Sequence, residues 1–229
     1  MRNISVIPVL PYKIPPIEDI TDELPKHAEK VYPTRDLEQI DCITVHHMAS
    51  EAPLMNQAAF HVNGRGWAGI GYQMVISDGR LYQCHDLTTQ SNHSSGHNDH
   101  SIAISIRGDL SKRPLTPIER ELLYSGILTL KYYIPSIKYI VGHNEQSKTS
   151  CPCISMNQVR QDIASLEEQM QFESQPNNRV ADYFKAKERF ADLYDKFVNK
   201  DKKWPTVVQA EAGRKLGIGY ASLKENGFL

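Results

Sequence analysis

The sequence predicts an α/β domain with a mixed central β-sheet flanked by helices, followed by a small helical C-terminal region. Three observations support this fold class. Short β-branched runs alternate with amphipathic segments of helical length, a pattern typical of interleaved strands and helices. The pair Asp78-Gly79 joins two strand-like runs and predicts a hairpin, so the sheet contains an antiparallel pair. The length of 229 residues suffices for one domain with a sizeable core and a small additional region.

The first predicted elements are a strand, a short helix, the hairpin and a further strand. Residues 42–47 (CITVHH) form a β-branched run and predict the first strand. The segment PLMNQAAFHVNG predicts a helix that ends at Gly64, and GYQMVISDGRLYQCHD contains the hairpin. Residues 101–108 (SIAISIRG) alternate apolar and polar side chains, which predicts a half-buried strand.

Two longer helices are marked by capping signals. Thr116, Pro117 and Glu119 form a capping box with proline at the first helical position, which predicts a helix over residues 117–133. The run IKYIVGH predicts the next strand, and Ser155 with a glutamine three residues later forms a second capping box. The apolar face of the helix that follows consists of Met156, Val159, Ile163, Leu166 and Met170.

Composition divides the chain into four parts. Residues 1–36 are rich in proline and mixed charge and predict an extended arm packed on the main domain. Residues 37–172 hold the predicted sheet and helices, residues 173–178 form a polar linker, and residues 179–229 predict a small helical region. The aromatic stripe of that last region, which predicts a packed helix face, consists of Tyr183, Phe190, Tyr194 and Phe197.

Charge and hydropathy restrict the partners. A formal net charge of -1 argues against broad electrostatic binding to nucleic acid. No apolar run approaches the roughly 20 residues of a membrane helix, so we expect no membrane partner. The N-terminal stretch has neither an apolar signal core nor a cleavage site, which predicts no signal peptide and therefore reduced cysteines.

The stretch VGHNEQSKTSCPC (residues 141–153) contains a histidine, an acid and two of the four cysteines of the chain. His46 and His143 each end a predicted strand, which gives a ligand a rigid mount, and Cys151 follows His143 by eight residues. Two histidines, one cysteine and an open fourth position would suit a catalytic zinc site. From the residues alone the alternatives stay open: hydrogen-bonded structural histidines, and Cys151 with Cys153 as buried small side chains or part of a closed zinc site.

Four blocks then carry a family resemblance. In chain order they are ITVHHMAS, GIGYQMVISDGRLYQCHD, SNHSSGHNDHSIAISIRG and VGHNEQSKTSCP. Together they resemble the type 2 N-acetylmuramoyl-L-alanine amidase family, which includes bacteriophage lysis amidases and animal peptidoglycan recognition proteins. The resemblance covers residues 40–170 and implies the amidase fold for the main domain.

The resemblance implies a Zn²⁺ cofactor and a role for individual residues. It makes His46, His143 and Cys151 the zinc ligands and leaves Cys153 without a counterpart. It makes Tyr72 the catalytic tyrosine. The remaining implied position, at which a histidine would line the groove near substrate, is His93.

Three more positions near the ligand cysteine are implied as catalytic assistants. Phage members commonly carry lysine two residues before that cysteine, where this chain has Thr149, while Lys148 is one position further back. Which of the two would meet the developing oxyanion stays open. Glu145 matches an acid found at this place in the family and would support a ligand histidine or carry a proton.

The resemblance implies zinc-dependent hydrolysis of the amide bond between N-acetylmuramic acid and L-alanine in bacterial peptidoglycan. We expect a bacteriolytic phage or prophage endolysin that is made in the host cytoplasm and acts on the cell wall after release. The alternative is a module that binds peptidoglycan without cleaving it. For residues 179–229 we expect binding to a cell-wall polymer, with nucleic-acid contact as the weaker alternative.

Overall fold

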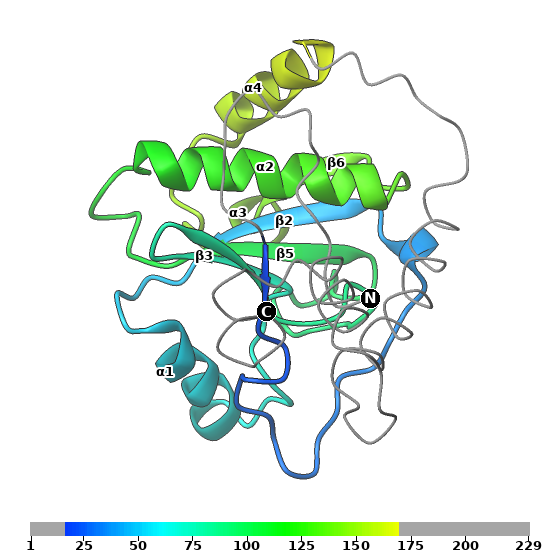
Figure 1. The fold of residues 1–229 in the computed structure, drawn as a ribbon, viewed down its shortest axis with the longest axis vertical. Helices are drawn as coiled ribbons and strands as arrows, with labels where there is room; N and C mark the ends of the chain where they lie inside the picture. Colours follow the sequence, from blue (N-terminus) through cyan, green and yellow to red (C-terminus); the bar gives the residue numbers. More distant parts are fainter. Residues whose placement is uncertain (1–16, 170–229) are drawn as a thin grey trace, which may run out of the picture. The chain divides into compact units, whose positions relative to one another are not determined.

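The computed structural model describes residues 17–169 (Figure 1). The predictions for residues 1–16, for the linker and for the C-terminal helical region fall outside this part. The described strands form one mixed sheet in the order β1-β4-β3-β5-β2-β6. Their bounds are β1 (Glu18–Asp19), β2 (Cys42–His47), β3 (Met74–Ser77), β4 (Arg80–Gln83), β5 (Ser101–Ile106) and β6 (Tyr139–Gly142). The hairpin strands β3 and β4 are antiparallel and the other neighbours are parallel, which confirms the predicted mixed sheet.

Helices cover both faces of this sheet. Their bounds are η1 (Leu37–Gln39), α1 (Leu54–Ala59), the π-helical turn η2 (Phe60–Gly64), α2 (Pro117–Tyr133), α3 (His143–Gln146) and α4 (Met156–Gln169). Helix α2 lies across one face and α1 lies on the opposite side, while α4 packs against α2 and β6 (Figure 1). The predicted fold class is therefore confirmed. Within residues 17–169, no helix has both the length and the apolar character that crossing a membrane requires.

The central strand β5 is buried along its whole length, and the prediction for this strand was wrong. We expected β5 to be half-buried, but all six of its residues are buried. Helix α2 covers the isoleucine side: a Cβ added at Gly126 would lie 3.4 Å from the Ile104 side chain. The serines are covered as well, since Ser101 contacts the His93 ring. The alternation therefore marks two buried faces of different chemistry.

The turn between β3 and β4 has the backbone that its sequence predicts. Asp78 has a φ of 50° and Gly79 a φ of 72°, and a two-residue hairpin turn of type I′ requires positive φ at both positions. A Cβ added at Gly79 would meet nothing within 4 Å, so glycine serves the backbone conformation there.

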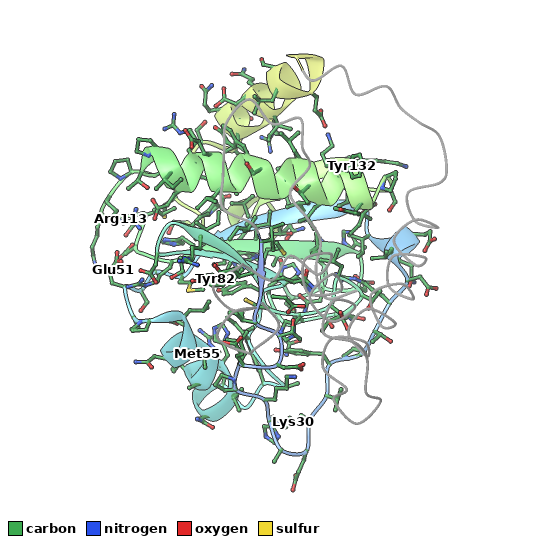
Figure 2. All side chains as sticks on the ribbon, viewed as in Figure 1. Lys30, Glu51, Met55, Tyr82, Arg113 and Tyr132 are labelled. Carbon is green, nitrogen blue, oxygen red and sulfur yellow. The ribbon has the colours of Figure 1, made fainter. Side chains whose placement is uncertain are left out.

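The start of α2 is fixed by its capping box and by one arginine. Glu119 N–H donates to Thr116 Oγ1 at 3.3 Å, and Thr116 N–H donates to the Glu119 carboxylate at 2.9 Å. Both terminal nitrogens of Arg113 bind that carboxylate at 2.8 Å, and Arg113 Nε lies 3.6 Å from Glu51 (Figure 2). Arg113 thereby ties the segment after β2 to the start of α2.

The described part of the N-terminal segment runs along the sheet edge. Strand β1 pairs with β4, and Thr34 forms a bridge with Thr89. Ile17 and Leu24 are buried.

Candidate metal centre

The two predicted histidine ligands lie at the carboxyl ends of neighbouring parallel strands. His46 is the penultimate residue of β2, and His143 directly follows β6. Val45 is in register with Gly142, so the two histidines occupy adjacent positions at the same sheet edge. Their ring centroids are 4.5 Å apart. Open α/β sheets place ligand sites at this edge.

Cys151 comes from the loop between α3 and α4 and completes the group. Its sulfur lies 3.8 Å from His46 Nδ1 and accepts the His47 backbone N–H at 3.4 Å. The ligand atoms of His46, His143 and Cys151 all lie within 4.8 Å of one another, and within residues 17–169 this is the group of ligand side chains with that geometry.

The donor set fits zinc. Zn–N bonds of about 2.05 Å and Zn–S bonds of about 2.3 Å at tetrahedral angles place a nitrogen and a sulfur roughly 3.6 Å apart. The distance of 3.8 Å between His46 Nδ1 and Cys151 Sγ is close to that value. Three protein ligands would leave the fourth position for water or substrate, as in catalytic zinc sites.

The protonation states of the three side chains follow from burial. Burial, reinforced by His93 and His143, holds the pKa of His46 well below its usual value, and burial also lowers the pKa of His143. Both imidazoles are therefore neutral near pH 7, as ligation requires. Burial raises the pKa of the Cys151 thiol to about 11, so metal binding at neutral pH must displace its proton.

Tyr72 lies beside this group, with its ring centroid 5.3 Å from that of His46. Burial raises the pKa of Tyr72 to about 12, and the nearby Cys151 sulfur acts in the same direction. The phenol therefore keeps its hydrogen at neutral pH and can donate a hydrogen bond toward the centre.

His61, which was not predicted as a site residue, holds the backbone that carries Tyr72. Gly71 N–H donates to His61 Nδ1 at 3.0 Å, and the buried His61 ring lies between those of Trp67 and Tyr72, at 4.9 and 5.6 Å. A Cβ at Gly71 would approach the Asn92 carbonyl oxygen to 2.5 Å, so only glycine fits there. The Gly-Tyr pair was visible in the sequence. Its contact with a helix residue ten positions earlier depends on tertiary structure and could not be seen there.

The three predicted assistants have different surroundings. Thr149 is exposed, and its Oγ1 accepts the Cys151 N–H at 3.2 Å, which leaves its own hydrogen free to donate. Lys148 is exposed. Glu145 is held by Arg160 of α4 at 3.0 and 3.1 Å and accepts the Gly142 N–H at 2.8 Å. These contacts turn the Glu145 carboxylate toward α4 and the end of β6.

His93 is 8% exposed and contacts the Nε2 edge of His46. Its Nδ1 lies 3.2 Å from His46 Nε2, on the other side of the His46 ring from Cys151. Cys153 is not in the ligand group, and its sulfur lies 3.9 Å from His47 Nε2.

The family model described as N-acetylmuramoyl-L-alanine amidase (Amidase_2) matches residues 36–154. The chain belongs to this amidase family. The matched range contains every site residue that the sequence predicted, from His46 to Cys151.

Proteins similar to this chain include insect and phage proteins. Peptidoglycan-recognition protein SC2 of Drosophila melanogaster is 30% identical over 113 residues, which cover 47% of this chain and 60% of that relative's length. The endolysin of Thermus scotoductus MAT2119 bacteriophage Ph2119 superposes with a TM-score of 0.55 at 25% identity, over 66% of this chain and 97% of the endolysin.

Two further solved structures share the fold. The endolysin amidase LysCS from Clostridium intestinale URNW has a TM-score of 0.55 at 20% identity and covers 66% of this chain and 97% of its own. The ectodomain complex of peptidoglycan recognition proteins LCa and LCx, solved with tracheal cytotoxin, has a TM-score of 0.55 at 22% identity, over 62% of this chain and 93% of its own. At these identities the likeness shows the fold alone.

Proposed function

We propose that this chain is a zinc-dependent amidase that hydrolyses the bond between N-acetylmuramic acid and L-alanine in bacterial peptidoglycan. The observation that carries the proposal is the group of His46, His143 and Cys151, whose ligand atoms lie within 4.8 Å. Tyr72 lies next to this group in a chain of the amidase family. The chain spans only 60% of the curated relative described above, so the activity of the whole protein is part of the proposal.

When bound, zinc would activate a water molecule and polarise the scissile carbonyl. The protein side chains would supply the hydrogen bonds. Tyr72 remains protonated at neutral pH and would donate to the oxygen of the carbonyl under attack. Thr149 Oγ1 already accepts from Cys151 N–H, so its hydrogen would point toward a second acceptor. Removing one such donor typically costs about 10²–10³-fold in kcat.

Glu145 is poorly suited to carry the proton to the leaving amine. Partial burial acts to raise its pKa, but the Arg160 guanidinium and the Gly142 N–H together hold the pKa below its usual value. The carboxylate is therefore ionised and already paired. We assign it the role of fixing Gly142, and through it the backbone of His143.

The second candidate function is peptidoglycan binding without cleavage. The insect relatives are named as recognition proteins, and two solved neighbours were determined with tracheal cytotoxin, a monomeric peptidoglycan. The presence of all three ligand side chains and of Tyr72 favours catalysis in this chain.

Digestion of purified cell wall separates the two functions. The zinc-loaded protein is expected to release new L-alanine amino termini without new reducing sugar ends, and chelation should abolish the release until zinc is restored. Reducing ends would instead identify a glycosidase. Retention on the wall without any cleavage would establish the binding module.

We further propose an endolysin role in which the enzyme leaves the host cytoplasm and reaches the wall only after the membrane is permeabilised. The 25% identity with a phage endolysin supports this role. Cytoplasmic expression in bacteria should cause lysis only when a pore-forming protein is expressed with it. Binding of residues 179–229 to a cell-wall polymer remains a proposal from sequence, and sedimentation with purified wall should fall when the chain is truncated at residue 175.

A further inference from the structure

A chain of hydrogen bonds connects His46 through His93 to Ser101, starting from the His46 ring nitrogen that faces away from Cys151. His93 Nδ1 lies 3.2 Å from His46 Nε2. The other ring nitrogen, His93 Nε2, lies 3.3 Å from the Ser101 carbonyl oxygen and 3.2 Å from Ser101 Oγ. Both histidines and Ser101 are buried, so each hydrogen in this hydrogen-bond chain has a defined partner.

Which atoms donate and which accept in this hydrogen-bond chain follows from the contacts of Ser101. The Ser101 carbonyl oxygen can only accept, and the Ser101 hydroxyl donates its hydrogen to the His97 carbonyl oxygen. Both groups facing His93 Nε2 are therefore acceptors, so Nε2 carries the hydrogen. With its hydrogen on Nε2, the neutral His93 ring presents a lone pair at Nδ1.

The hydrogen position on His93 then determines the hydrogen position on His46. A lone pair on His93 Nδ1 requires a hydrogen on His46 Nε2, and the neutral His46 ring must then have a lone pair on Nδ1. This is the nitrogen that lies 3.8 Å from Cys151 Sγ. The opposite tautomer would place two lone pairs against each other at 3.2 Å and would point an N–H into the metal centre.

We propose that His93 is a positioning residue that holds His46 in the tautomer with hydrogen on Nε2 and a free lone pair on Nδ1 facing the metal centre. This inference rests on the proposed function in that the centre is taken to bind zinc. The expected place of His93 at the substrate groove stays a prediction, and the contact with His46 Nε2 gives the residue this additional role. Outer partners of ligand histidines typically raise metal affinity by about 10–100-fold.

A matched pair of variants tests the role of the acceptor on His93. In His93→Asn the amide oxygen occupies the place of Nδ1 and can accept the His46 hydrogen, whereas His93→Leu has a similar shape without an acceptor. Zinc affinity, measured by competition with a chromophoric chelator, should stay within about threefold for His93→Asn and fall by about 10–100-fold for His93→Leu. His85→Leu removes a buried histidine that binds the Ile70 carbonyl oxygen at 2.7 Å and should leave zinc affinity unchanged.

The tautomer itself can be measured without metal. Long-range ¹H–¹⁵N spectra of the metal-free, unsubstituted chain should show the Nε2–H pattern for His46 and for His93. An Nδ1–H pattern on His46 would overturn the proposal even if His93→Leu failed to fold. Unchanged zinc affinity in a folded His93→Leu would also overturn it while leaving the amidase proposal intact. An unsubstituted chain that binds no zinc would refute the proposed function, and the spectra would still decide the tautomer.

Discussion

Substituting Gly142 by alanine should disturb the metal centre through one unavoidable contact. Gly142 ends β6 and precedes the ligand His143. A Cβ at this position would lie 2.5 Å from Asn144 Oδ1, 2.8 Å from Pro152 Cδ and 2.9 Å from Met156 Cγ. The backbone is ordinary, with φ of -87°, so the effect of Gly142→Ala is purely steric.

The contact with Pro152 sets the magnitude. The Asn144 and Met156 side chains can rotate away, but the proline ring is fixed to the backbone next to the ligand Cys151. Relief from 2.8 Å to the ordinary contact of 3.4 Å requires a shift of 0.6 Å, the difference of the two distances. Metal sites tolerate ligand displacements of about 0.2 Å, so the shift should weaken zinc binding by roughly tenfold or more. Overpacking of this kind typically costs about 1–3 kcal/mol of folding free energy.

Urea unfolding of the metal-free protein measures the loss of folding free energy, and chelator competition measures the loss of zinc affinity separately. Gly126→Ala is the matched control: its Cβ would lie 3.3 Å from Leu81 and 3.4 Å from Ile104, at the ends of flexible side chains. The higher helix propensity of alanine, about 1 kcal/mol, offsets that crowding, so both readouts should stay near those of the unsubstituted protein. A Gly142→Ala protein with an unchanged urea midpoint and zinc affinity within twofold would show that the contact with Pro152 does not act on the metal centre.

Three further outcomes are expected. Cys151→Ser should lose zinc affinity at least about 100-fold while Cys153→Ser keeps it, and the reverse in equilibrium dialysis would overturn the ligand assignment. Tyr72→Phe should lower kcat by about 10²–10³-fold with little change in KM, and a change confined to KM would contradict the role of the hydroxyl as a transition-state donor. Burial, with Arg65 as a smaller cause, lowers the pKa of His61 from 6.5 to about 4. The contribution of neutral His61 to the free energy of unfolding is therefore complete above pH 6.5. It falls by roughly 1.4 kcal/mol for each pH unit as the pH decreases from 6.5 toward 4. Urea unfolding of the metal-free protein from pH 7 to 4.5 should show a smaller dependence of the unfolding free energy on pH in His61→Gln than in the unsubstituted protein. Identical slopes would contradict this role of His61.

The positions of the two candidate ligand histidines could be predicted because strand ends are visible in a sequence. CITVHH and IKYIVGH each have the β-branched or apolar run that ends at a histidine, and the structure places β2 and β6 accordingly. That these strands are neighbours could not be predicted from periodicity, because strand order depends on contacts between distant segments. The residues alone suggested the grouping of His46 with His143, the family resemblance decided between the alternatives, and the parallel register of β2 and β6 gives the grouping its physical basis.

The surroundings of the site were less predictable. Glu145 was expected near a ligand histidine or in proton transfer, yet its partner Arg160 lies fifteen positions later on α4. His93 was expected at the substrate groove, and only the three-dimensional structure shows its contact with His46 Nε2. In both cases the informative contact joins elements whose relative placement depends on the packing of the whole sheet.

The adjacent histidines and the Cys-Pro-Cys segment raise the question of why one open site is expected here and not a closed four-ligand site. Successive residues of a strand point to opposite faces, so His46 and His47 cannot both face His143. His47 instead accepts the Leu110 N–H on Nδ1 at 3.0 Å, and its Nε2 lies 3.9 Å from the Cys153 sulfur. His46 and Cys151 form the corresponding pair on the side of His143. The strand period therefore separates two histidine–cysteine pairs and keeps Cys153 away from the fourth position, which is the arrangement that a hydrolytic zinc site requires.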